Sequence, residues 1–174
     1  YMHYFAQEYG EKGMDKEGFS GKDGRTTIFD YWSVDTMCRA DEGNLTEDEK
    51  KLADIYSKLM NFARTDKTVT GLSYDLMYAN PHSASFNPDR QYAFLRRSGR
   101  QLLVVVVNFD NLDRDILLNI PEHAFEYLKL SDGKDVMGEE ILTGESFAAC
   151  LSSKQPLSIH VPKSGAAIIK INKA

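Results

Sequence analysis

The fold is decided by residues 91–109, which read QYAFLRRSGRQLLVVVVNF. Two apolar runs, rich in aromatic and β-branched residues, flank the dipeptide Ser98-Gly99. Such runs favour strands, and a glycine-containing pair between them is typical of a hairpin turn. The stretch therefore predicts a β-hairpin, in which we expect Tyr92 and Phe94 to share one face and to belong to the core.

Short runs of the same kind continue toward the C-terminus, separated by turn residues. Strands are predicted over 71–78, 91–97, 100–109, 115–120, 134–137, 145–149, 157–161 and 166–171. Residues 122–130 are compatible with either a short helix or an irregular link. Short strands at regular spacing are typical of a sandwich or a small barrel. We expect residues 67–174 to form an antiparallel β-sandwich of about seven or eight strands.

A helix is predicted immediately before this region. Thr46 and Glu49 have the spacing of a capping box, in which each side chain accepts a hydrogen bond from the other residue's backbone amide. The helix should end near Arg64, and its apolar residues fall on one face at helical spacing: Leu52, Ile55, Tyr56, Leu59, Phe62 and Ala63. The sequence thus divides into a leader with a helix, residues 1–66, and an all-β region, residues 67–174.

The first residues, YMHYFA at positions 1–6, form an apolar and aromatic run without an initiator methionine at position 1. Such a run is typical of a buried strand, which needs neighbouring strands on both sides. We therefore expect the chain to be a piece of a larger protein. Exposure of this remnant would favour self-association of the isolated chain.

Composition excludes several classes of function. The formal net charge is −5 and no basic cluster exceeds two residues, which argues against a nucleic-acid partner. No apolar stretch approaches the roughly 20 residues of a membrane span. The two cysteines, Cys38 and Cys150, are far apart and favour thiols, with a disulfide left open. The compartment stays unknown.

Three stretches, in order, resemble the α-amylase superfamily of glycoside hydrolases. YFAQEYG at 4–10 is similar to the family's last barrel strand, and GRTTIFDYW at 24–32 to the loop beyond it. YAFLR at 92–96, followed by LVVVVNF at 103–109, is similar to the opening hairpin of the family's C-terminal sandwich. Ala6 departs from the family's usual glycine, which leaves the substrate linkage open.

The resemblance implies a domain organisation and a function. Residues 1–66 would be the end of the catalytic (β/α)8 barrel, with its last strand, loop and final helix, and residues 67–174 the C-terminal sandwich. The chain would then be the C-terminal fragment of a retaining glycosidase acting on α-glucans such as starch or maltodextrin. Its partner would be the upstream barrel of the same polypeptide. The family's catalytic carboxylates lie on earlier barrel strands, so we expect no catalytic residue here and no activity of the fragment alone.

The resemblance also suggests site residues. Arg25, Tyr31 and Trp32 would line the substrate cleft of the parent enzyme, although a structural salt bridge and packing on the helix remain alternatives. Glu8 is expected to be a structural carboxylate. No cofactor and no metal site are predicted, because the histidines are scattered. Asp110, Asp113 and Asp115 could offer oxygens to Ca²⁺, but the glycine and distal glutamate of an EF-hand loop are missing, which favours a solvated strand connection.

Three functions compete for the chain. The first is structural, with the sandwich stabilising the parent hydrolase. The second is a carbohydrate-binding module with an α-glucan as ligand, which requires exposed aromatics on the sandwich; the candidates are Tyr74, Tyr78, Phe86, Tyr92 and Tyr127. The third is a small, non-enzymatic interaction domain unrelated to amylases.

Overall fold

The computed structural model describes residue 3 and residues 6–11 and 35–174. The chain divides into two compact units, Tyr1–Asn61 and Phe62–Ala174. The first unit contains the 3-10 turn η1 (Gln7–Tyr9), helix α1 (Asp35–Asp41) and most of helix α2 (Glu47–Thr65). The sequence did not indicate α1.

The predicted capping box of α2 is confirmed. The Thr46 amide donates to Glu49 Oε2 at 2.8 Å, and the Glu49 amide donates to Thr46 Oγ1 at 3.3 Å. The Glu49 carboxylate also accepts two hydrogen bonds from Arg39 of α1, at 2.5 and 2.6 Å. Hydrogen bonds from Arg39 and then from Thr46 lower the pKa of Glu49 to about 2, so the carboxylate stays charged. The same residue therefore caps α2 and joins α1 to it.

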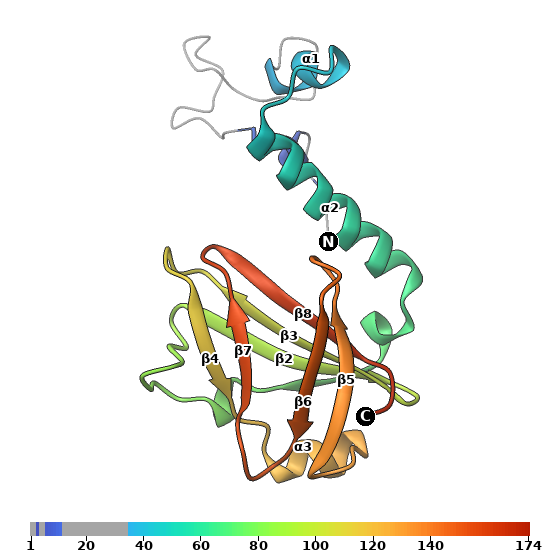
Figure 1. The fold of residues 1–174 in the computed structure, drawn as a ribbon, viewed down its shortest axis with the longest axis vertical. Coiled ribbons are helices and arrows are strands. Elements are labelled where there is room, and N and C mark those ends of the chain that lie inside the picture. Colours follow the sequence, from blue (N-terminus) through green and yellow to red (C-terminus); the bar gives the residue numbers. More distant parts are fainter. Residues whose placement is uncertain (1–2, 4–5, 12–34) are drawn as a thin grey trace, which may run out of the picture. The chain divides into compact units, whose positions relative to one another are not determined.

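The second unit is mainly antiparallel β-structure, as predicted (Figure 1). Its larger sheet has six strands in the order β1-β2-β3-β8-β5-β6, and β4 pairs with β7 in a second sheet. Figure 1 shows β4 and β7 crossing the direction of β2, β3 and β8. The elements, besides the 3-10 turns η3 (Lys67–Thr70) and η4 (Met77–Ala79), are β1 (Leu72–Asp75), β2 (Gln91–Ser98), β3 (Gln101–Asn108), β4 (Arg114–Leu118), α3 (Glu122–Leu128), β5 (Lys134–Glu140), β6 (Ser146–Leu151), β7 (Leu157–Val161) and β8 (Gly165–Ile171).

The hairpin predicted at Ser98-Gly99 joins β2 to β3. Ser98 pairs with Gln101, and Gly99 has a φ of 59°, a left-handed conformation that glycine adopts without a steric penalty. β3 then pairs with β8 along its whole length, so the valine-rich strand lies at the centre of the larger sheet. Both faces of β3 are apolar, and all of its residues except Gln101 and Val107 are buried.

The core lies between the two sheets and is closed at one end by α3. It contains, among other residues, Leu95, Val104, Val106, Ile116, Leu118, Phe125, Leu128, Ile159, Val161 and Ile169. The expectation that Tyr92 and Phe94 belong to this core is wrong. Gln91, Ala93 and Leu95 are the buried residues of β2, whereas Tyr92 is 43% exposed and Phe94 is half-buried. Because side chains alternate along a strand, a one-residue error in the assigned face moves every side chain to the other side.

The outer face of the larger sheet also carries apolar side chains. Phe94, Val105 and Ile168 lie in register on β2, β3 and β8, and Tyr92 pairs with Val107 in the next row. Val105 and Ile168 are buried but do not belong to the core between the sheets. We call Tyr92, Phe94, Val105, Val107 and Ile168 the outer apolar face.

The segment between α2 and β1 is fixed to the sandwich by two contacts. The Asp66 carboxylate accepts hydrogen bonds from the Thr68 amide, at 2.8 Å, and from Lys170 Nζ of β8. Gly71 lies so close to β2 that a Cβ atom there would be 2.1 Å from the Arg97 carbonyl oxygen. Any larger residue at position 71 would displace the backbone of β2.

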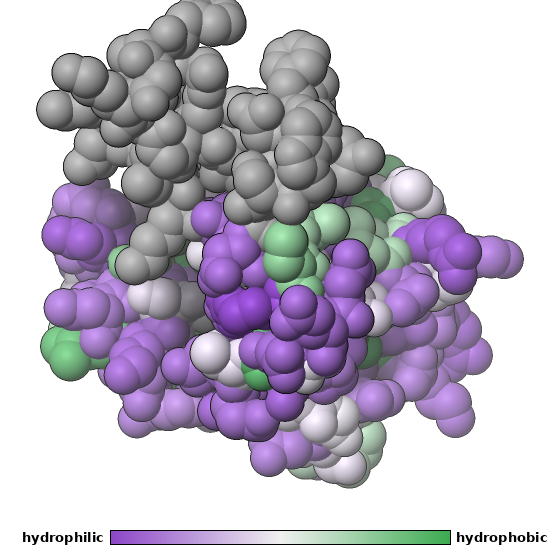
Figure 2. All heavy atoms as spheres, turned by 90° about the horizontal axis from the view of Figure 1, so that it is seen from above, coloured by the Kyte–Doolittle hydropathy of each residue, from purple (hydrophilic) through white to green (hydrophobic). Residues whose placement is uncertain are grey.

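The surface of the molecule is characterised by its hydropathy and by its cysteines. Figure 2 shows mainly hydrophilic side chains on the face seen from above, with apolar side chains in small, separate groups. Cys38 and Cys150 are not joined by a disulfide. Within residues 3, 6–11 and 35–174, no helix has the length and apolar character required to cross a membrane.

Candidate aromatic ligand-binding pocket

An aromatic pocket lies beside β1, the edge strand of the larger sheet. Its volume is about 420 Å³, which is within the range of small-ligand sites. Tyr74 of β1 is buried, whereas Tyr78 of η4 and Tyr127 of α3 are 67% and 48% exposed. The residues that line it are Ser73, Tyr74, Asp75, Tyr78, His123 and Tyr127, and we call it the Tyr78 pocket.

Local structure explains why these side chains meet. Asp75 Oδ1 accepts a hydrogen bond from the Met77 amide at 2.8 Å, which fixes the turn that carries Tyr78. In α3, the buried residues Ala124, Phe125 and Leu128 face the core. His123 and Tyr127, four residues apart, therefore share another face of the helix and stack with ring centroids 6.4 Å apart.

A chain of hydrogen bonds connects three of the pocket side chains. The Tyr74 hydroxyl bonds to the Tyr78 hydroxyl on one side and to His123 Nδ1, at 2.9 Å, on the other. The Tyr74 ring is also 5.9 Å from that of Tyr127, between ring centroids. Burial, and then the hydrogen bond with Tyr78, raise the pKa of Tyr74 well above its usual value. The Tyr74 phenol therefore remains protonated at all physiological pH values.

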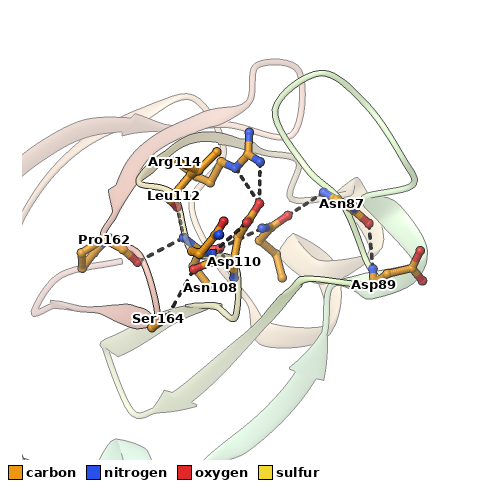
Figure 3. A network of polar contacts seen from close by, with 10 residues as sticks. Asn87, Asp89, Asn108, Asp110, Leu112, Arg114, Pro162 and Ser164 are labelled. Atoms are coloured by element: carbon orange, nitrogen blue, oxygen red, sulfur yellow. Dashed lines mark hydrogen bonds and ion pairs between the residues drawn. The ribbon is translucent and has the colours of Figure 1, made fainter.

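A second group of polar side chains lies around Asn108, at the C-terminal end of β3 (Figure 3). Asn108 Nδ2 donates to the carbonyl oxygens of Leu112 and Pro162, at 2.9 and 3.1 Å. Asn108 Oδ1 accepts from Gln91 Nε2 at 2.9 Å and from the Asp110 amide at 3.1 Å. Both donor hydrogens and both acceptor positions of this buried amide are thus used within the protein. The network joins loops and leaves Asn108 no group for a ligand.

The aspartates considered for Ca²⁺ have partners within the protein. Asp110 forms an ion pair with Arg114, Asp113 accepts from the Lys163 amide at 2.8 Å, and Asp115 lies 2.8 Å from His160 Nδ1. Hydrogen bonding from Arg114 lowers the pKa of Asp110. In the described part of the chain, no group of three or more histidine, cysteine, aspartate or glutamate side chains is arranged to hold a metal ion.

The site residues suggested by the family resemblance stay predictions. Arg25, Tyr31 and Trp32 lie outside the described residues. Glu8 lies in η1, and its Oε2 atom is 2.7 Å from His3 Nε2. On α2, Ile55 of the predicted apolar face is exposed, and self-association through the barrel remnant stays a prediction.

The sandwich aromatics named from the sequence lie in different parts of the structure. Tyr74, Tyr78 and Tyr127 come together in the Tyr78 pocket. Phe86 is buried in the core and cannot contact a ligand, and Tyr92 lies on the outer apolar face instead. His123 was not singled out as a site residue. Its spacing of four residues from Tyr127, within a segment already considered as a helix, is the signal that places it beside that ring.

The fold is similar to that of solved glycosidase structures. A noncanonic maltogenic alpha-amylase, AmyB, from Thermotoga neapolitana is 11% identical with a TM-score of 0.52, over 71% of this chain and 26% of that one. AmyP in complex with maltose is 16% identical with a TM-score of 0.51, over 73% and 22%. Alpha-galactosidase I from Mortierella vinacea is 10% identical with a TM-score of 0.50, over 74% and 29%. At such identities the likeness shows the fold alone, and the matched regions are about a quarter of each solved chain.

The sequence itself matches a family model. Residues 83–172 match the model of the alpha amylase C-terminal all-beta domain, and this segment is more than half of the 174 residues. It contains every strand from β2 to β8. No curated protein matches the chain. The chain therefore belongs to the alpha amylase C-terminal all-beta domain family.

Proposed function

We propose that this chain is the C-terminal part of a glycoside hydrolase that acts on α-glucans, and that its sandwich stabilises the catalytic barrel of the same polypeptide. Residues 1–66 would then be the end of that barrel and residues 67–174 the sandwich domain. Retaining hydrolysis requires two carboxyl groups about 5 Å apart. We assign these groups to the upstream barrel, so that the chain alone is inactive.

One observation supports the structural role, namely the outer apolar face. A sheet in a two-layer sandwich has one face on the core and one face outside. Here Phe94, Val105 and Ile168 form an apolar row on the outer side of three neighbouring strands. Tyr92 extends this face and is half-exposed. Val105 and Ile168 are already buried, so the gain when another domain covers this face would come mainly from Tyr92 and Phe94, at about 25 cal/mol per Å² of apolar area removed from water.

Charged substitutions on the two sheets test this role. Tyr92 of β2 is 43% exposed and Leu117 of β4 is 46% exposed, so they are matched in exposure but lie on different sheets. In the longer polypeptide that includes the barrel, we expect Tyr92→Glu to lower the melting temperature and the rate of starch hydrolysis. Leu117→Glu should leave both close to wild type. In the 174-residue chain alone, neither substitution should change the melting temperature by more than a few degrees.

The result that would contradict the structural role is an equal effect of the two substitutions in the longer polypeptide. The hydrolase assignment has its own test: the longer polypeptide should release reducing sugar from soluble starch, whereas the 174-residue chain should not. An interaction domain unrelated to amylases does not fit the family to which the chain belongs.

A further inference from the structure

We infer that the Tyr78 pocket is a binding site for a neutral pyranose ring of an α-glucan chain. The inference rests on the proposed function, because the kind of glycan follows from it. Tyr74 and Tyr78 precede residue 83, where the match to the family model begins. The pocket is therefore built partly from residues that the family model does not include.

The exposed rings provide the apolar contact. Tyr78 comes from η4 and Tyr127 from α3, and both side chains are exposed. An aromatic ring offers a large apolar face together with a polar tip, which suits a sugar ring with C–H groups on its faces and hydroxyls around its edge. Tyr127 is held in place by stacking on His123 and by a tilted contact with the Tyr74 ring. Part of the contact surface is thus ordered before any ligand arrives.

The hydrogen-bond chain provides the polar contacts. Tyr74 occupies its middle, while Tyr78 and His123 are its two ends. Within the described residues, His123 Nε2 has no protein partner, and the Tyr78 hydroxyl bonds only to Tyr74. If Tyr74 donates to His123 Nδ1, then Nε2 carries a proton and donates, while Tyr78 accepts from the ligand; in the reverse orientation Tyr78 donates. Sugar hydroxyls both donate and accept, so they match either orientation.

The charge of the pocket disfavours anionic ligands. Among the lining residues that the structure describes, Asp75 is an acid and none is lysine or arginine. Oδ1 of Asp75 is used by the Met77 amide, which leaves Oδ2 as an acceptor at the rim. Phosphates, uronic acids and nucleic acids are disfavoured, because sites for such anions require cationic side chains.

Affinity electrophoresis with soluble starch tests the site in the 174-residue chain. Tyr78 and Phe109 are both 67% exposed, and Phe109 follows β3 and is not among the pocket residues, so Phe109→Ala is a matched control. We expect wild type and Phe109→Ala to be retarded equally by starch. Tyr78→Ala and Tyr127→Ala should each weaken binding by about tenfold or more, which is the size of a lost ring contact. Unchanged mobility of wild type would overturn the inference, and so would equal binding by all four proteins.

A titration with maltoheptaose, followed by NMR of the histidine side chains, locates the ligand. The chain has four histidines, and only His123 lines the pocket. We expect the His123 signals to move with the same saturation curve as starch binding, and those of His82 and His160 to stay in place. A proline-rich peptide that moves the His123 signals, with no response to maltoheptaose, would overturn the inference in favour of a protein ligand.

Failure of this inference and failure of the proposed function give different results. If the pocket is empty of glucan but the function holds, the longer polypeptide hydrolyses starch and Tyr78→Ala leaves starch binding unchanged. If the function fails, the longer polypeptide does not hydrolyse starch at all. Starch hydrolysis by the longer polypeptide, together with selective loss of starch binding in Tyr78→Ala but not in Phe109→Ala, supports both.

Discussion

The Asn108 network and the Tyr78 pocket are both groups of polar side chains held by loops and strand ends, yet they differ in what they leave available. The side-chain amide of Asn108 is buried, and all of its hydrogen-bonding positions are used within the protein. Tyr78 and Tyr127 are exposed, and the hydrogen-bond chain ends at groups that face the pocket. The buried amide of Asn108 therefore stabilises the fold, whereas the exposed groups of the Tyr78 pocket are available to a ligand.

The comparison also shows why sequence motifs need a structure before a role is assigned. Asn108-Phe109 is part of the segment that resembles the family, and its asparagine has a structural role. The pocket side chains belong to no recognised motif. Substitutions in the Asn108 network, where every hydrogen-bonding position of the amide is used, should lower stability. Substitutions in the Tyr78 pocket should weaken binding and have little effect on stability.

The largest expected effect is that of Asn108→Ala. The substitution leaves Gln91 Nε2 and the carbonyl oxygens of Leu112 and Pro162 without their partner in a buried site. We expect the free energy of unfolding to fall by about 3 kcal/mol, since each buried polar group left unpaired costs about 1–3 kcal/mol. Urea denaturation measures the change. Asn111→Ala, on an exposed neighbour, should change stability by less than about 0.5 kcal/mol. Equal losses of stability in Asn108→Ala and Asn111→Ala would contradict the stabilising role of the buried Asn108 network.

A smaller effect on stability is expected at Asp66, whose carboxylate also accepts hydrogen bonds from within the protein. Burial opposes its ionisation, but hydrogen bonds from Lys170 and Thr68 together lower the pKa of Asp66 below its usual value. A carboxyl whose folded pKa is lowered stabilises the fold above its unfolded pKa, and that contribution is lost as the pH falls through the folded pKa. Stability should therefore decrease from about pH 4 downward.

Asp66→Asn provides the matched comparison for this pH dependence. We expect it to lower the free energy of unfolding at pH 7 by about 2 kcal/mol, the usual range for a hydrogen bond to a charged group. Its unfolding free energy should also depend less on pH in the acid range than that of wild type. Parallel acid profiles for the two proteins would show that Asp66 is not the group responsible.

The smallest effect on stability is expected for Tyr78→Ala. The side chain is largely exposed, and its one hydrogen bond is to Tyr74, which keeps His123 as a partner. We expect the unfolding free energy to change by less than about 0.5 kcal/mol while starch binding weakens by about tenfold or more. Thermal unfolding of the variant, measured with and without maltoheptaose, gives both quantities. A loss of stability similar to that of Asn108→Ala would place Tyr78 among the structural residues.

Much of the second unit follows from local patterns in the sequence. The strands, the hairpin at Ser98-Gly99 and the capping box at Thr46 and Glu49 were predicted, because period-two alternation, turn residues and helix caps depend on neighbours in the chain. The outcome for Tyr92 shows the limit. Both faces of the hairpin are apolar, so alternation alone does not tell which face meets the second sheet.

The candidate site was predicted only in part, for a related reason. Tyr78 and Tyr127 were named as spare aromatics, but they are 49 residues apart, and their meeting depends on how α3 packs beside β1. Phe86 was named with equal weight and proves to be buried. Composition gives the number of aromatics, whereas the three-dimensional packing decides which of them reach the solvent.

The attachment of Asp66 to Lys170 has a practical consequence for dissecting the protein. A sandwich expressed from residue 67 onward would lack the carboxylate that pairs with Lys170, and it would begin inside the turn that leads to Gly71. A clone beginning at Phe62, the first residue of the second unit, retains both anchors. The residue at which the recombinant domain begins therefore decides whether the segment before β1 keeps its ion pair with β8.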